Sequence, residues 1–302
     1  MVGSAVLRQS KQAGYDVLTA KKFELNLSDA EATQRFLTRE KPDAVILAAA
    51  RVGGIEANRL HRADFLVENL EIQNSVIKGA LKSNVPRLIF LGSSCVYPKN
   101  FSGEISETDL LSGPLEETNE GYALAKIAGI KYCEYLSQEE GVMYNSVMPP
   151  NLYGPYDNFD LNSSHVPAAL MRRFHEAKVN SANEVVIWGS GKPLREFMHV
   201  DDLASAVLFA LENYREPGLL NIGPAPELSI ADFALAMKEV VGYGGTITFD
   251  ASKPDGVSRK RLNCARISAL GWKPSIGIVE GLASTYEWLR GELKKEAVRG
   301  WN

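Results

Sequence analysis

The sequence has few cysteines, no excess of positive charge and no long apolar run, and each shortage excludes a class of protein. Its three cysteines, Cys95, Cys133 and Cys264, lie far apart, without a C-x-x-C pair or a histidine-rich ligand spacing. That pattern argues against a disulfide framework and a zinc site, and it favours a reducing compartment. The net charge of −4 provides none of the basic field that nucleic acids attract. No stretch approaches the ~20 apolar residues of a membrane span, and the first residues lack a signal-peptide layout. We therefore expect a cytoplasmic protein that holds no metal and binds neither nucleic acid nor membranes.

Short apolar runs alternate with longer amphipathic segments up to about residue 150. The apolar runs lie at 16–20, 43–50, 87–94 and 145–151, and the segments between them have helical periodicity. Continuous apolar strands separated by helices are typical of a parallel sheet that is covered on both faces. We predict an α/β fold with a Rossmann-like doubly wound parallel sheet, in which ligands bind at the carboxyl ends of the strands.

The pattern changes after Pro149–Pro150 to a turn-rich loop, further helices and a tail that Gly and Pro interrupt. We predict a first domain over residues 1–164, with a returning segment near 191–215, and a smaller, interleaved domain over 165–302. The opening segment MVGSAVLRQSKQAG resembles a helix already under way. A dinucleotide-binding fold begins with a strand and a glycine-rich turn. We expect that first strand and most of the turn to be missing, with Gly3 as the last of its glycines.

Tyr122 and Lys126 in EGYALAKIAG are four residues apart, so a helix would place them on one face. A phenol is a poor acid or base at neutral pH, and a nearby ammonium group lowers its pKa. We therefore expect Tyr122 to be usable as an acid–base group, although such a pair is common on helices by chance. Ser93, at the end of the run 87–94, would complete the set by hydrogen bonding a substrate carbonyl that Tyr122 protonates.

These residues resemble the extended short-chain dehydrogenase/reductase family that acts on nucleotide sugars, of the NAD-dependent epimerase/dehydratase type. Six segments resemble, within that family, the 3,5-epimerase/4-reductases of GDP-4-keto-6-deoxy-D-mannose: AAARVGGIEAN, LGSSCVYPK, EGYALAKIAGIK, NSVMPPNLYGPYDNF, WGSGKPLREFMHVDD and DASKPDG. The resemblance runs from about Val2 to Trp288. It implies a GDP-sugar substrate, NADP(H) as cofactor, and a homodimer formed through the helices expected at 63–81 and 122–141.

Cys95 invites two interpretations. Strand alternation would point it to the same side as Ser93, yet most free cysteines are small buried hydrophobic residues. Epimerisation beside a ketone needs a base and an acid on opposite faces of the sugar, and a thiol near a cation can supply the base. The resemblance assigns the base to Cys95 and the acid to His165. Ser93 and Tyr122 would then hold the enolate oxygen, and Lys126 would tune Tyr122 and hold the nicotinamide ribose.

Two lysines, Lys21 and Lys22, follow the run 16–20, where NAD-preferring proteins place a carboxylate. A cation there favours the 2′-phosphate of NADP(H), although two lysines can also be a solvated strand end. The resemblance implies a larger set of cofactor-binding residues: Gly3, Lys22, Leu91, Gly92, Ser93, Ser94, Lys126, Pro149, Asn151, Leu152 and His165. The substrate-binding residues that it implies are Arg173, Trp188, Arg195, Asp255 and Lys260.

Two alternatives remain open at this point. The first is another nucleotide-sugar epimerase or dehydratase of the same family. A dehydratase would be expected to carry an acidic pair beside Ser93, and positions 94–96 are Ser-Cys-Val. The second is a truncated, non-catalytic NADP-binding protein, which would have no need of Ser93, Tyr122 and Lys126 together.

Overall fold

The computed structural model describes residues 1–101, 103–161, 163–224, 226–253 and 255–301. Its first region is built on a four-stranded parallel sheet. The strand order is β1 (Ala44–Leu47), β2 (Arg87–Leu91), β4 (Met143–Met148) and β9 (Gly218–Asn221). Three of these strands are the apolar runs that the sequence predicts between residues 43 and 151.

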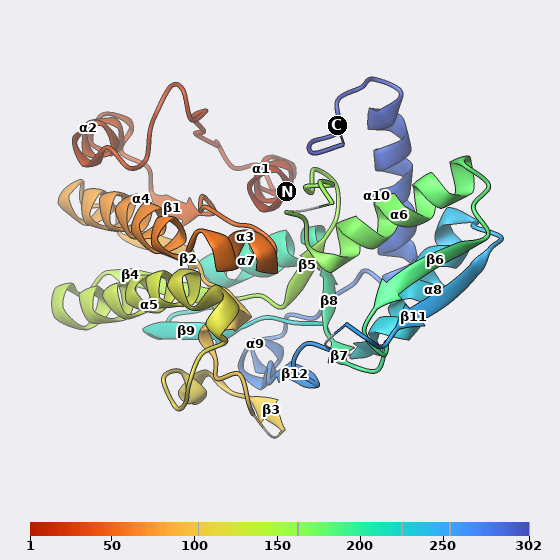
Figure 1. Cartoon of the computed structure of the whole chain (residues 1–302). Helices are drawn as coiled ribbons and strands as arrows, with labels where there is room; N and C mark the ends of the chain where they lie inside the picture. Colours follow the sequence, from red (N-terminus) through yellow and green to blue (C-terminus); the bar gives the residue numbers. More distant parts are fainter. Residues whose placement is uncertain (102, 162, 225, 254, 302) are drawn as a thin grey trace.

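Helices cover both faces of this sheet, which confirms the predicted fold class (Figure 1). Strand β2 shows the two faces directly, because its buried side chains alternate between two cores. Leu88 and Phe90 face the core that contains α4 (Arg62–Lys82) and α5 (Glu120–Glu140), with α2 (Ala30–Glu40) packed on α4. Ile89 and Leu91 face α7 (Val200–Asn213), which packs on α1 (Val2–Gln12).

The predicted strand at 16–20 is wrong. Residues 15–28 connect α1 to α2 without a strand, and Tyr15 and Leu18 are exposed. A strand needs a neighbour for its backbone hydrogen bonds. In the described chain, β1 is the outermost strand of the sheet. It pairs with β2 on one side, and no strand lies on its other side, so no further strand links residues 16–20 to the sheet.

A second region lies beside the first and has its own core, which includes Phe174, Phe233 and Leu282. Its helices are α6 (Val166–Val179), α8 (Ile230–Val241) and α10 (Ile278–Leu293), next to the parallel pair β6 (Glu184–Trp188) and β11 (Thr246–Asp250) (Figure 1). Helix α7, from the segment predicted to return, packs on the first region, and β9 extends the first sheet beyond residue 215.

Two small sheets join the regions. One has the order β10 (Leu228–Ser229), β7 (Leu194–Arg195), β12 (Arg259–Leu262) and β3 (Glu104–Ile105), and the other pairs β5 (Asn151–Tyr153) with β8 (Phe197–His199). The remaining short helices are α3 (Ile55–Leu60), α9 (Ala265–Ala269) and the 3₁₀ turns η1 (Ser94–Val96), η2 (Glu107–Asp109) and η3 (Glu117–Asn119).

Among the described residues, no helix is both long and apolar enough to cross a membrane. The same residues contain no group of three or more His, Cys, Asp or Glu side chains that could hold a metal ion.

Candidate active site at the end of β2

Ser93 and Cys95 lie just beyond the carboxyl end of β2, on a segment tied to the neighbouring strand. The Gly92 amide donates to Val147 O at 2.9 Å, and the Ser94 amide donates to Pro149 O at 3.1 Å. Residues 94–96 form a 3₁₀ turn, and the Ser93 hydroxyl accepts a hydrogen bond from the Cys95 amide at 3.4 Å. Strand alternation therefore does not apply to Cys95, because the strand has ended. The tight turn brings its thiol to the Ser93 side chain instead.

Helix α5 places Tyr122 and Lys126 against the same segment. Lys126 is 3% exposed, and its ammonium group donates to Leu91 O at 2.7 Å. The Lys126 Nζ also lies 4.5 Å from the centre of the Phe90 ring and 5.7 Å from that of Tyr122. The helical spacing therefore does bring the phenol and the ammonium together at the sheet edge, as the sequence predicts.

The expected lowering of the Tyr122 pKa is wrong. Burial raises the pKa of Tyr122 well above its ordinary value, and a nearby Cys95 thiolate would raise it further. Burial also lowers the pKa of Lys126 to about 8, against a smaller opposite effect of Cys95. Desolvation disfavours whichever form is charged, and it is the largest effect on the pKa of both groups. Tyr122 is thus held as a neutral phenol, which is a proton donor.

Cys95 lies between two cations. Burial raises the pKa of its thiol, while the Ser93 side chain, then Lys260 and Lys126, act in the opposite direction. Lys260 comes from β12. Its approach to Cys95 depends on the pairing of β12 with β3 and β7, which the sequence does not reveal. The same lysine is next to Arg195 of β7 in the parallel register of β12 and β7. Lys260 therefore joins the Cys95 cluster to the predicted substrate-binding residues.

Asp255 and Arg195 lie at the far end of this group. The Asp255 carboxylate accepts hydrogen bonds from the Ser190 amide at 2.8 Å and the Ser190 hydroxyl at 2.6 Å. These bonds lower the pKa of Asp255, with a smaller contribution from cations that include Arg195. Burial lowers the pKa of Arg195, and Asp255 opposes that effect. A cation and a hydrogen-bonded carboxylate therefore lie next to Lys260.

Trp188 provides a flat apolar surface flanked by cations. Its side chain is 64% exposed, and the guanidinium of Arg173 and the ammonium of Lys253 lie 5.8 and 5.5 Å from the ring centre. Arg173 projects from α6 and also donates to Val186 O at 3.4 Å. An exposed indole between two cations can stack on a base while the cations bind phosphate groups.

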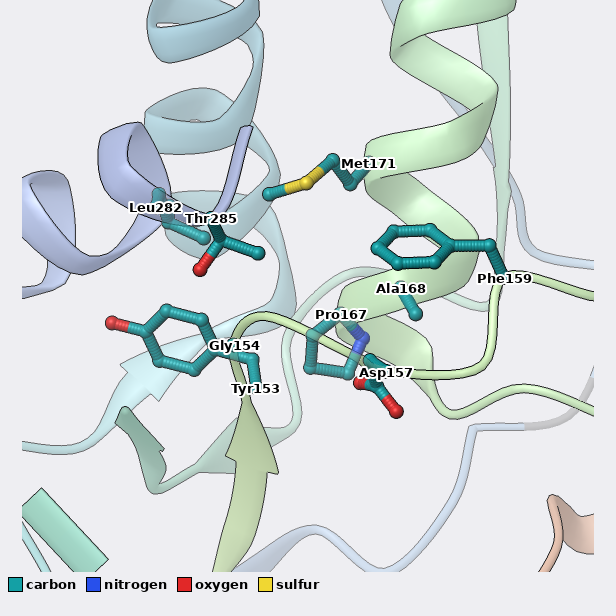
Figure 2. A pocket seen from close by; sticks show the side chains of 9 residues that line it. All are labelled: Tyr153, Gly154, Asp157, Phe159, Pro167, Ala168, Met171, Leu282 and Thr285. Atoms are coloured by element: carbon teal, nitrogen blue, oxygen red, sulfur yellow. The ribbon is translucent and has the colours of Figure 1, made fainter. Parts of the chain in front are cut away.

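His165 belongs to a different group from Cys95. It is the N-cap residue of α6, it is exposed, and its charge acts on the carboxyl of Asp157. Asp157 is 7% exposed, and burial raises the pKa of this carboxyl. Figure 2 shows Asp157 beside Pro167 of α6, at the rim of a small pocket whose other lining residues are mostly apolar. None of the predicted catalytic residues lines that pocket.

Most of the predicted cofactor residues lie together, whereas Gly3, Lys22 and His165 lie on three other segments. Leu91, Gly92, Ser93, Ser94, Lys126, Pro149, Asn151 and Leu152 lie around the carboxyl ends of β2 and β4. The Met148 side chain packs closely on Gly92, since a Cβ atom at position 92 would lie 2.5 Å from the Met148 sulfur. Gly3 lies in the first turn of α1, near Ala48, and that turn has no acidic residue. Lys22 is on the exposed 15–28 connection instead of at a strand end.

The fold and this arrangement are those of a nucleotide-binding α/β protein with a cluster of polar and titratable side chains at the carboxyl edge of its sheet. The sequence model of the NAD dependent epimerase/dehydratase family matches residues 1–223, and the chain belongs to this family.

The chain is similar to several named proteins. It is 50% identical to the probable GDP-L-fucose synthase 1 of Oryza sativa subsp. japonica over 95% of this chain and 88% of that protein. It is 48% identical to the GDP-L-fucose synthase of Escherichia coli (strain K12), over 95% of this chain and 93% of the relative. The solved structure of a GDP-L-fucose synthetase from Naegleria fowleri bound to NADP superposes with a TM-score of 0.91 at 28% identity, covering 99% of this chain and 91% of that one.

Proposed function

We propose that this protein is an NADPH-dependent enzyme that epimerises GDP-4-keto-6-deoxy-D-mannose at C3 and C5 and reduces it at C4 to GDP-L-fucose. The observation that carries the proposal is the cluster of Ser93, Cys95, Tyr122 and Lys126 at the end of β2, with Lys260 beside the thiol. The relatives of about 50% identity, which are named as GDP-L-fucose synthases, support the choice of substrate.

In the epimerisation steps the 4-keto group acidifies the protons on C3 and C5. The Cys95 thiolate would remove a proton from one face of the sugar, and electrons would move into the C4 oxygen to form an enolate. Ser93 and Tyr122 would donate hydrogen bonds to that oxygen. His165 would return a proton to the other face. Lys260 and Lys126 favour the thiolate, but they act against burial, which is the larger effect and leaves the pKa of the Cys95 thiol above its ordinary value instead of lowered as the sequence suggests.

In the reduction step Tyr122 would give its proton to the C4 oxygen. The raised pKa of Tyr122 keeps the phenol protonated until that step, and Lys126 lies close enough to stabilise the phenolate that forms. When bound, NADPH would supply the hydride to C4. The same hydroxyl pair would thus serve both reactions, since each step places negative charge on one oxygen.

The residues present fit this cofactor. The first turn of α1 has backbone N–H groups without helical partners and no acidic side chain of its own, which suits a pyrophosphate, although the Asp157 carboxyl acts on the Met1 amino group at the start of the helix. Gly92 and Lys126 would border the nicotinamide half, and Lys22 would approach the 2′-phosphate. Arg173, Arg195 and Lys260 would bind the diphosphate of the GDP sugar, with Trp188 and Asp255 as further contacts.

The decisive experiment incubates the protein with GDP-4-keto-6-deoxy-D-mannose and NADPH in deuterated water. We expect loss of NADPH absorbance, a product identified as GDP-L-fucose, and deuterium at both C3 and C5. A reduced product without inversion or deuterium would assign the protein to a simple 4-keto reductase. Cofactor binding without turnover would assign it to the non-catalytic alternative.

We also propose a homodimer that uses α4 and α5, and a cytoplasmic location. The two helices pack on each other, and their outer surface exposes the side chains of Val67, Leu124 and Tyr135. Light scattering after size exclusion would measure the mass in solution. Replacement of Leu124 by Glu should shift a dimer to the monomer mass, and an unchanged mass would exclude this interface.

A further inference from the structure

His165 lies at the end of a turn whose position depends on a close backbone contact. Gly54 follows β1, and its amide donates to Ser163 O at 2.9 Å. A Cβ atom at position 54 would lie 2.8 Å from Ser164 O and 3.3 Å from Ser163 O. Both neighbours are backbone atoms, so neither could move away by changing a rotamer. The turn before His165 therefore packs directly on a glycine of the first region.

The backbone conformation of Gly54 does not itself require glycine. Its φ of −64° and ψ of 178° are accessible to any residue. The lack of a side chain is needed only for the approach to Ser163 and Ser164. Position 54 thus requires glycine for packing and not for backbone conformation. An alanine there tests the contact with Ser163 and Ser164 without straining the backbone dihedral angles.

The segment around Gly54 is itself held firmly. Asn58 is 6% exposed, and its side-chain amide donates to Gly53 O at 2.7 Å and to Gly54 O at 3.0 Å. The next helix begins at Arg62, where a Cβ on Gly121 would lie 2.5 Å from Arg62 O. Gly121 precedes Tyr122. One segment, 53–62, thus contacts the turn before His165 at one end and the helix turn that carries Tyr122 at the other.

We propose that Gly54 is a positioning residue, which sets the place of the His165 imidazole relative to the Cys95 and Tyr122 cluster through its contact with Ser163 and Ser164. The inference rests on the proposed function, because it takes His165 as the acid of the epimerisation. A larger residue at position 54 would push the 163–165 turn outward while leaving Cys95, on the 3₁₀ turn that follows β2, undisturbed.

The test separates proton removal from inversion, with GDP-4-keto-6-deoxy-D-mannose in deuterated water without NADPH. Cys95 alone can remove the C3 proton and return deuterium to the same face, whereas inversion needs an acid on the opposite face. We expect Gly54→Ala to keep deuterium exchange at C3 and to lower the ratio of inversion to exchange at least about tenfold, since small misplacements of reacting groups are costly. His165→Gln should lower the same ratio, and Cys95→Ser should lower both rates.

Gly277→Ala is the matched control. Gly277 is also a helix N-cap residue, with φ −67° and ψ 155°, and no heavy atom lies within 4 Å of an added Cβ. This variant should keep the wild-type ratio. If Gly54→Ala fails to fold, Asn58→Ala replaces it, since that change frees the Gly53 and Gly54 carbonyls without adding atoms, and it should lower the ratio in the same direction.

The outcomes distinguish the inference from the function on which it rests. A wild-type protein that neither exchanges nor inverts would refute the proposed epimerisation. A wild-type protein that does both, with a lowered ratio in His165→Gln and an unchanged ratio in Gly54→Ala or its replacement, would overturn the role of Gly54 alone. An equal fall of exchange and inversion in Gly54→Ala would also overturn it, because that result indicates general damage.

Discussion

Replacing Glu196 by Gln should make the protein more stable at alkaline pH and leave its stability in acid almost unchanged. Glu196 lies between β7 and β8 and is 2% exposed. Its carboxylate accepts a hydrogen bond from the Leu262 amide at 2.9 Å, which ties it to the strand that carries Lys260. A glutamine keeps an oxygen for that bond and removes the charge.

The size of the effect follows from the pKa of Glu196. Burial raises it from 4.5 to about 7, and Glu227 and Glu104 add to the rise, whereas the Leu262 amide and Arg261 oppose it. A carboxyl whose pKa is higher in the folded state destabilises the fold once the group ionises. No penalty exists below the unfolded pKa, and the full penalty exists above the folded one. The difference corresponds to about 3 kcal/mol, most of which develops between about pH 5 and about pH 8.

The assay is urea denaturation of both proteins at about pH 5 and about pH 8, followed by circular dichroism. The free energy of unfolding of Glu196→Gln, relative to the wild type, should increase by about 2.5 kcal/mol between the two pH values. Glu139→Gln, at an exposed position on α5, is the control and should show no such change. A difference between Glu196→Gln and wild type that stays constant with pH would refute the reasoning that burial governs this carboxyl.

Three further predictions concern the chemistry. Cys95→Ser should reduce deuterium incorporation at C3 and C5 by about a hundredfold or more, and reduction of an already epimerised 4-keto sugar should continue; normal exchange would exclude the thiol as the base. Tyr122→Phe should lower NADPH oxidation by about a hundredfold or more because the proton donor is lost, and rapid oxidation in this variant would mean that another group protonates the C4 oxygen. Lys260→Gln should move the rise of C3 exchange with pH to higher pH, because a cation that favours the Cys95 thiolate is removed. The pH profile of C3 exchange measures this shift, and a profile identical to that of the wild type would contradict the role of Lys260.

The sequence predicts a strand of the sheet correctly where the composition of that segment alone is sufficient. The runs that contain β1, β2 and β4 are rich in Val, Ile, Leu and Met, and longer helical segments separate them. Strands β2 and β4 are buried almost throughout, whereas only Leu47 of β1 is fully buried. Residues 16–20 have a similar composition and form no strand, since a strand also depends on a neighbour that composition does not reveal.

The site was predictable to the extent that it depends on local spacing. Tyr122 and Lys126 meet because they are four apart on a helix, and Ser93 follows a strand end. The direction of the Tyr122 pKa was not predictable, because burial decides it and burial is a property of the whole fold. The approach of Lys260 to Cys95 likewise depends on the pairing of β12 with β7 and β3, which joins segments far apart in the chain.

Within the part of the chain that the structure describes, one side of β1 has no partner strand, and this has a practical consequence for handling the protein. Backbone donors and acceptors along such a margin can recruit a strand from another molecule, and proteins usually protect them with charges, bulges or a covering segment. Residues 44–47 are Ala-Val-Ile-Leu and supply no charge of their own. Concentrated solutions should therefore self-associate through this strand, and a charged substitution on its accessible face offers a direct way to keep the enzyme dispersed for the experiments above.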